Sequence, residues 1–280
     1  MRKLTIYPIL LATACALAGC GGGGGGGFGV NTIPPPPPLP PPPPPPPPTP
    51  DIIPAATTSQ QFAVSAADQQ LQVRYVAASN SYEVQLPQSQ NWIAISRSPT
   101  DPNNPVIYTG GGVTLWLRPG SFQYSRLFEW SASGDGLGGY EAIGSATPSA
   151  GVPVTGSATY AGQIVGRTSE YQAALADDFP VDGSIQLLFD FGLGSLSGSI
   201  SPNLHQGYTL GSLNFRDTVY STGSTTFSGK FDTSVAGANS FSGLFTGPAA
   251  QELIGNFVFP YKSPIDGKVY QADGVFAGAK

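Results

Sequence analysis

Few residues in this chain of 280 residues could carry chemistry. His205 is the only histidine, and the only cysteines are Cys15 and Cys20. A zinc site needs several histidine or cysteine ligands close together, so no metal site is expected.

Two glycine-rich stretches match enzyme motifs only in part. A serine hydrolase elbow has the form Gly-x-Ser-x-Gly, but residues 194–198 place leucine at the nucleophile position. Residues 134–139 fit a dinucleotide-binding pattern by letters alone, without the strand before it and the helix after it that the motif requires, and we interpret them as a loop. We therefore expect no catalytic residue and no cofactor, and we do not expect an enzyme.

Cys20 has a different chemistry, because it ends a short export signal. Arg2 and Lys3 precede an apolar run over residues 6–18 that is too short to span a bilayer. The run ends in Leu17-Ala18-Gly19-Cys20, which resembles a bacterial lipobox. The resemblance implies cleavage before Cys20 and attachment of a lipid to its sulfur; the alternative is an ordinary signal peptide with an incidental cysteine. Because Cys15 lies within the removed signal, no intramolecular disulfide is expected.

His205 lies in a stretch, residues 201–207, that reads as the tip of a hairpin. A histidine in such a loop could ligate haem iron. The simpler alternative is an exposed histidine without a role. We keep His205 as a speculative ligand contact.

The chain after Cys20 begins with a low-complexity tether. Seven glycines follow at residues 21–27, and residues 34–50 are prolines interrupted by Leu39 and Thr49. Glycines give a flexible chain, and the prolines predict a polyproline-II rod of about 3.1 Å per residue, roughly 50 Å in all. We expect a signal peptide over residues 1–19, a disordered tether over 20–54, a β-rich domain over 55–150 and a β-barrel over 151–280.

The charge balance bears on the class of partner. Removal of Arg2 and Lys3 with the signal leaves 10 basic and 17 acidic residues, a formal charge of −7. No basic patch is evident, so nucleic acid is not an expected partner.

Eight short segments of the last 130 or so residues alternate between apolar or glycine residues and polar residues. Phe227-Ser228-Gly229-Lys230-Phe231 and Phe241-Ser242-Gly243-Leu244-Phe245 are the clearest examples. Alternate residues of a strand share a face, so each segment presents phenylalanine and glycine on one side. The pattern predicts an all-β fold with an eight-stranded antiparallel barrel, since alternating large and small side chains fill a small barrel interior. A soluble barrel with its apolar face inside is favoured over the inverted alternative, an integral outer-membrane barrel.

Residues 60–147 predict a smaller, irregular β-rich domain before the barrel. Residues 71–76 and 82–86 alternate around a turn and predict a hairpin, and further strands are expected at 92–96, 113–117 and 122–130. Residues 169–178 are the one good helix candidate, and residues 247–253 could form a single helical turn.

Two motifs resemble a known family. Residues 141–148 with 152–162 are similar to the entry into the β-barrel of transferrin-binding protein B lobes. Residues 241–259, which contain Gly247-Pro248-Ala249-Ala250-Gln251, resemble that family's strand, short helical turn and strand, and residues 274–280 resemble its ending.

The resemblance implies one lobe, made of a handle domain and an eight-stranded barrel, held at the outer membrane by the lipid on Cys20. It also implies display on the cell surface by an outer-membrane translocator, binding of a host or environmental protein or of an iron- or haem-carrying ligand through loops, and cooperation with a TonB-dependent receptor. A structural envelope lipoprotein without a ligand is the alternative. Because no ligand-contact motif of the family matches, no binding residues are carried over.

Overall fold

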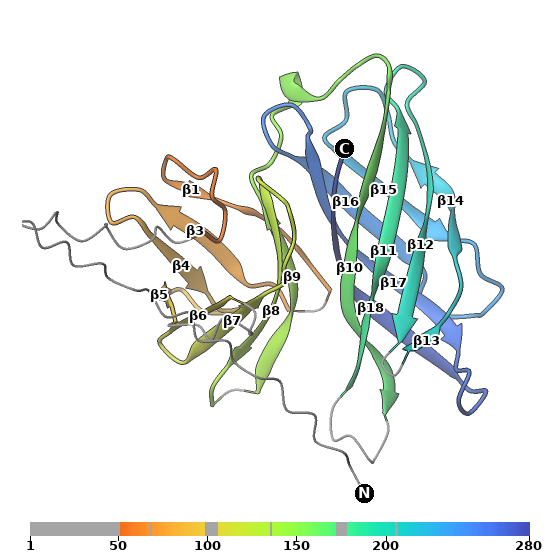
Figure 1. The fold of residues 1–280 in the computed structure, drawn as a ribbon, viewed down its shortest axis with the longest axis horizontal. Coiled ribbons are helices and arrows are strands. Elements are labelled where there is room, and N and C mark those ends of the chain that lie inside the picture. Colours follow the sequence, from red (N-terminus) through yellow and green to blue (C-terminus); the bar gives the residue numbers. More distant parts are fainter. Residues whose placement is uncertain (1–50, 68, 99–105, 135, 172–177, 205–206) are drawn as a thin grey trace, which may run out of the picture. The chain divides into compact units, whose positions relative to one another are not determined.

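The computed structural model describes most of the chain after the proline-rich segment and shows strands and turns there with almost no helix, so the predicted all-β class is confirmed (Figure 1). The described residues are 51–67, 69–98, 106–134, 136–171, 178–204 and 207–280. The expected export signal, Cys20 and the expected tether as far as residue 50 lie outside them, and so does His205. No helix in these ranges has the length and apolar character needed to cross a membrane.

The first nine strands form one antiparallel sheet, which we call the handle. The order of its strands is β1-β3-β4-β5-β6-β7-β8-β9-β2. Their bounds are β1 Gln60–Gln61, β2 Ala63–Ala66, β3 Gln72–Val76, β4 Ser81–Gln85, β5 Trp92–Arg97, β6 Ile107–Gly110, β7 Val113–Leu117, β8 Ser125–Ala132 and β9 Leu137–Gly144. The predicted hairpin of β3 and β4 is confirmed, with Val73 opposite Val84.

The handle sheet curls almost into a second barrel because its first strand segment changes partner. β1 pairs with β3, whereas β2, which begins two residues after β1 ends, pairs with β9 at the other edge of the sheet. The interior of the curl is an apolar core that includes Phe62, Tyr82 and Trp130. The apolar residues that alternate along the handle strands are therefore buried in this core.

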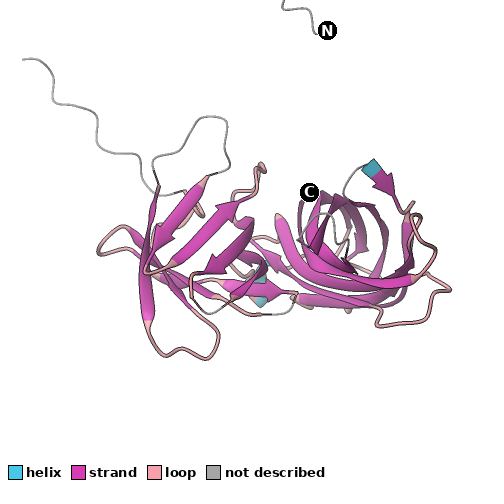
Figure 2. Cartoon of the chain, turned by 90° about the horizontal axis from the view of Figure 1, so that it is seen from below, coloured by secondary structure: helices cyan, strands magenta, loops and turns pink. Residues whose placement is uncertain are grey.

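The remaining strands form the eight-stranded barrel that the sequence predicted, together with the two-residue strand β13, which pairs with β12 beside the ring. The sheet runs β11-β10-β18-β17-β16-β15-β14-β12-β13, and additional pairing of β11 with β12 closes it. Figure 2 shows these strands curving into a ring. The bounds are β10 Ser157–Tyr171, β11 Asp178–Asp190, β12 Ser195–Leu204, β13 Tyr208–Thr209, β14 Leu213–Val219, β15 Thr226–Phe231, β16 Ser240–Thr246, β17 Glu252–Lys262 and β18 Val269–Ala279; η1, Ser149–Gly151, precedes them.

Phenylalanine and glycine fill the barrel interior together, as expected. The ring of Phe189 contacts the rings of Tyr160, Phe227 and Phe245 at centroid distances of 5.6, 5.1 and 4.9 Å. Inward glycines lie under rings from neighbouring strands: a Cβ at Gly243 would lie 2.4 Å from Phe227 Cζ, and one at Gly255 would lie 2.0 Å from Phe276 Cζ. Only glycine leaves room for these rings.

The outer face of the barrel is not polar throughout, contrary to expectation. Val165, Ile254, Val275 and Ala277 point outward from β10, β17 and β18 and form a buried cluster with Leu127 and Ala142 of the handle. These strands are therefore apolar on both faces because the handle covers one of them.

Several expected boundaries are wrong. Residues 51–54, which the sequence assigned to the tether, belong to the folded body, since Ile52 and Ile53 are fully buried in the handle core. A helix was expected over residues 169–178. The structure instead shows β10 as far as Tyr171 and the start of β11 at Asp178. Residues 172–177 between them lie outside the described part.

Two further local predictions fail. The glycine-rich stretch 134–139 is a loop only in its first part, because β9 starts at Leu137. Residues 247–250 turn without forming a helix, and β17 follows from Glu252. The sequence also gave no sign of β6, whose glycine, Gly110, packs so close to the Ala94 carbonyl that a Cβ would lie 2.0 Å from it.

Candidate functional site

The hairpin connections of the barrel divide into two sets, one at each end. Antiparallel neighbours reverse direction at every turn, so the connections after β10, β12, β15 and β17 share one end. We call this the loop end; it includes residues 232–239 and 263–268, whereas the connection after β10 lies outside the described residues and the one after β12 lies partly outside them. The connections at 191–194, 220–225 and 247–251 lie at the opposite end.

The 232–239 loop is held in place by side-chain amides. Asn239 accepts the Phe231 N–H at 2.9 Å through its Oδ1 and donates from Nδ2 to the Phe231 carbonyl at 2.9 Å. Gln271 of β18 donates to the carbonyl of Ala238 at 2.8 Å. These bonds tie the C-terminal end of the loop to the end of β15 and to β18.

The 263–268 loop is fixed by a buried carboxylate. Glu170 of β10 is only 3% exposed, and its two oxygens accept hydrogen bonds from the Tyr261 hydroxyl at 2.8 Å and the Ser263 hydroxyl at 2.7 Å. Ser263 Oγ in turn accepts the Ile265 N–H at 3.0 Å. Burial raises the pKa of Tyr261, as does its contact with Glu170, so the phenol keeps the proton that it donates. The loop therefore starts from a network with satisfied polar groups.

The sequence did not single out Glu170, Tyr261 or Ser263 as structural determinants of a loop. Glu170 was placed in the expected helix, but its position continues the inward set Tyr160, Ile164 and Thr168 at even spacing along β10. Extending the period of two past residue 168 would have shown that Glu170 faces inward.

The exposed surface of the loop end is a mixture of apolar and charged groups. Ile265 is 42% exposed, Val269 is 56% exposed and Tyr208 is 41% exposed. Hydrogen bonds from the Lys268 backbone and the Tyr270 hydroxyl lower the pKa of Asp266, which also lies 3.3 Å from Lys268 Nζ. Within the described ranges no three His, Cys, Asp or Glu side chains gather as a metal site would require. Such a surface is suited to contact with another molecule.

The two sequence motifs that carried the family resemblance meet where the handle joins the barrel. The Thr147 N–H donates to the Phe245 carbonyl at 2.9 Å, and the Thr147 hydroxyl donates to the Gly247 carbonyl at 2.7 Å. A Cβ on Gly144 would lie 2.4 Å from Thr246 Cγ2, so the last residue of β9 can approach β16 only as glycine.

The barrel also matches a known family. Residues 152–280 fit the family described as C-lobe and N-lobe β-barrels of transferrin-binding protein B. The barrel is transferrin-binding protein B-like. The handle residues lie outside this match. Comparison with curated proteins finds no match.

Solved structures of transferrin-binding protein B are similar to the chain at low identity. A variant of the vaccine antigen from Haemophilus parasuis Hp5 is 14% identical, with a TM-score of 0.45 over 76% of this chain and 51% of its own. The isotype 1 protein of serogroup B Neisseria meningitidis is 15% identical, with a TM-score of 0.45 over 80% of this chain and 43% of its own. The chain thus spans about half the length of these structures.

Glu252 fastens the transferrin-binding protein B-like barrel to the handle. This residue at the start of β17 is 4% exposed, and its carboxylate accepts the N–H groups of Gln123 at 2.6 Å and Tyr124 at 2.9 Å. Beside it, the hydroxyls of Ser125 and Thr246 are 2.6 Å apart and buried. Glu252 thus links the barrel to two backbone amides of the handle.

Proposed function

We propose that the chain is an outer-membrane lipoprotein that is anchored through a lipid on Cys20 and displayed at the cell surface, where its loop end binds an extracellular protein or an iron- or haem-carrying ligand. The observation that carries the proposal is the match of residues 152–280 to barrels of a protein named for binding transferrin. In this role an outer-membrane translocator and a TonB-dependent receptor would be its partners.

The geometry of the loop end supports binding. The 232–239 and 263–268 loops are tied to the barrel by hydrogen bonds, so little conformational entropy would be lost when a ligand orders them. Ile265 offers an apolar contact, and Asp266 and Lys268 beside it offer charges of both signs.

Surface plasmon resonance on the immobilised full chain tests the proposal with iron-loaded transferrin, iron-free transferrin, haemoglobin and haemin. We expect saturable binding of at least one of them. Ile265→Asp should weaken it about tenfold or more, because a charge would be buried against the ligand. Leu193→Asp is the matched control, since Leu193 is 82% exposed at the opposite end.

Each outcome separates the alternatives. Weakening by Leu193→Asp and not by Ile265→Asp would move the binding surface to the opposite end. Absence of a saturable partner among these ligands, and in a pull-down from serum, would favour the structural envelope lipoprotein. With haemin, we expect no Soret shift that His205→Ala abolishes; such a shift would assign His205 to the iron.

A further inference from the structure

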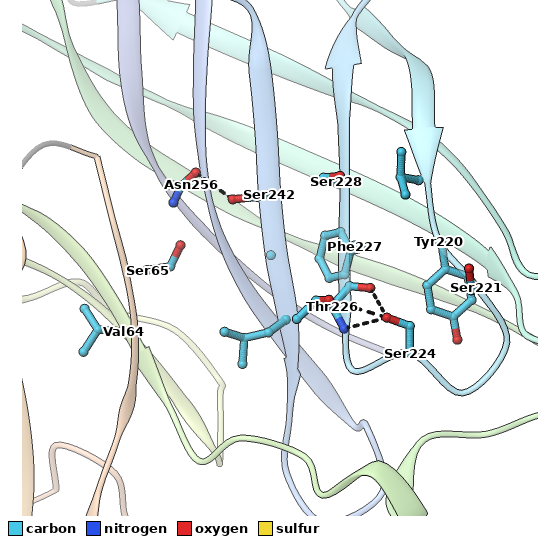
Figure 3. A pocket seen from close by; sticks show the side chains of 13 residues that line it. Val64, Ser65, Tyr220, Ser221, Ser224, Thr226, Phe227, Ser228, Ser242 and Asn256 are labelled. Carbon is cyan, nitrogen blue, oxygen red and sulfur yellow. Dashed lines mark hydrogen bonds between the residues drawn. The ribbon is translucent and has the colours of Figure 1, made fainter.

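A surface groove of about 420 Å³ lies between the handle and the outer face of the barrel, away from the loop end. Its walls come from β2 on the handle side and from β14 to β17, with the β14–β15 turn, on the barrel side (Figure 3). Its size falls within the range of about 300–1,000 Å³ that is usual for small-ligand sites.

The polar groups of the groove are hydroxyls and one carboxamide. Ser65, Ser228, Ser242 and Asn256 line it together with hydroxyls of the β14–β15 turn. Ser242 donates to Asn256 Oδ1 at 3.1 Å, which orients the carboxamide and leaves its Nδ2 as a donor (Figure 3). Val64, Val219 and Leu244 supply apolar surface between these groups.

Ser65 is the residue that distinguishes this groove from an ordinary polar surface. The residue is only 6% exposed, and among the residues that the structure describes no hydrogen bond to its hydroxyl is found, although this oxygen is not one of the enclosed polar atoms that lack a partner. The hydroxyl is therefore open to the groove, where it can donate one hydrogen bond to an external group and accept others from it.

The chemistry of that partner follows from the charges. No lining residue is an acid, a lysine, an arginine or a histidine. A charged ligand would lose water here without gaining a counter-charge, whereas a neutral ligand rich in hydroxyls would find both donors and acceptors. We propose that the groove binds a neutral sugar, either free or as the end of a glycan.

Nuclear magnetic resonance titration of the full, isotope-labelled chain tests the proposal with lactose, maltose, methyl β-N-acetylglucosaminide and sialylated lactose. We expect saturable shifts of the amides of Ser65, Ser242 and Asn256 with at least one neutral sugar. Ser242→Trp, which fills the groove, should abolish them. Ser197→Trp, at another exposed serine of a barrel strand on β12, should not. Ser65→Ala should raise the dissociation constant about three- to tenfold.

Three results would overturn the inference: no saturable shift at the groove with any neutral sugar at millimolar concentration, tighter binding of sialylated lactose than of lactose, or binding that survives Ser242→Trp. A glycopeptide that carries the same sugar distinguishes a free sugar from the end of a glycan as the natural ligand. If the glycopeptide binds more tightly than the free sugar, the ligand is the end of a glycan. If the two bind equally, the ligand is the free sugar. The inference is independent of the loop end, so Ile265→Asp should leave sugar binding unchanged.

Discussion

The protonation of Glu141 depends on the fold of the handle. It is fully buried in the handle, where its Oε1 accepts the Leu71 N–H at 2.7 Å and the Trp130 indole lies near its other oxygen without a hydrogen bond of normal geometry. Burial raises its pKa from 4.5 to about 9, and the bond from Leu71 opposes this only in part. The folded handle therefore holds Glu141 as a neutral acid at neutral pH.

This gives the stability of the protein a pH dependence with a definite sign. The unfolded chain loses the Glu141 proton above about pH 4.5 and the folded chain only near pH 9, so the free energy of unfolding should fall as pH rises between these values. The contribution is full below pH 4.5 and is lost above 9, with a slope of up to about 1.4 kcal/mol per pH unit.

Urea unfolding from pH 5 to pH 9 measures the slope, and Glu141→Gln should flatten it because glutamine does not titrate. An unchanged slope in the variant would assign the pH dependence to other groups. Only the slopes of the free energy of unfolding against pH are compared, and not its absolute values. The glutamine amide also replaces the carboxyl group that faces Trp130, and this changes the absolute stability.

At the scale of the element, the strands of the barrel depend on pairs of phenylalanine and glycine. Phe227 covers Gly243, Phe241 covers Gly229, Phe276 covers Gly255 and Phe257 covers Gly274, each across neighbouring strands. Strand glycines normally weaken a sheet, and here the ring above each one takes the space that a side chain would fill. The glycines are thus part of the packing of the core.

Gly243→Ala should lower the free energy of unfolding by about 1–3 kcal/mol, because its Cβ would overlap Phe227 Cζ at 2.4 Å and the Ile254 carbonyl at 2.6 Å. Thermal and urea unfolding measure the loss. The control is Gly192→Ala, where the nearest atom to the Cβ is the Asp190 carboxylate at 3.5 Å. If the two variants lose equal stability, overlap with Phe227 is not the cause of the loss.

At the scale of the molecule, the proline-rich tether leads directly into the handle. Ile52 and Ile53 are buried, the Tyr108 hydroxyl donates to Asp51 Oδ1 at 2.5 Å, and the Tyr82 hydroxyl bonds both the N–H and the carbonyl of Ile53. Burial raises the pKa of both phenols, so both remain donors. The chain is therefore packed into the handle core within three residues of the end of the proline-rich segment.

The anchoring part of the proposed function has its own test. Cys20→Ser should move the chain from the membrane fraction to the soluble fraction, because the serine hydroxyl cannot replace the sulfur that would bear the lipid. Protease added to intact cells should degrade the body of the unmodified chain. Protection until the outer membrane is permeabilised would place the body in the periplasm and contradict surface display.

The alternation of apolar and polar residues was sufficient to predict the barrel strands. It was not sufficient to predict the contacts between distant segments. The Phe-Gly-Phe segments indicated β15 and β16 because a period of two reports directly on which side chains share a face. The same rule missed Glu170, which is buried although it is charged, and Ser65, which is buried although no local pattern shows what covers it.

The sequence by itself determined the all-β class, the number of barrel strands and the phenylalanine and glycine interior, since these depend on the alternation of residues a few positions apart. Only the tertiary structure decided that Ile254 and Val275 lie under the handle, that Glu252 links handle to barrel, and that Ser65 faces a neutral groove. Each of these features joins residues more than a hundred positions apart or depends on which surface covers an outward face, and no local periodicity carries that information.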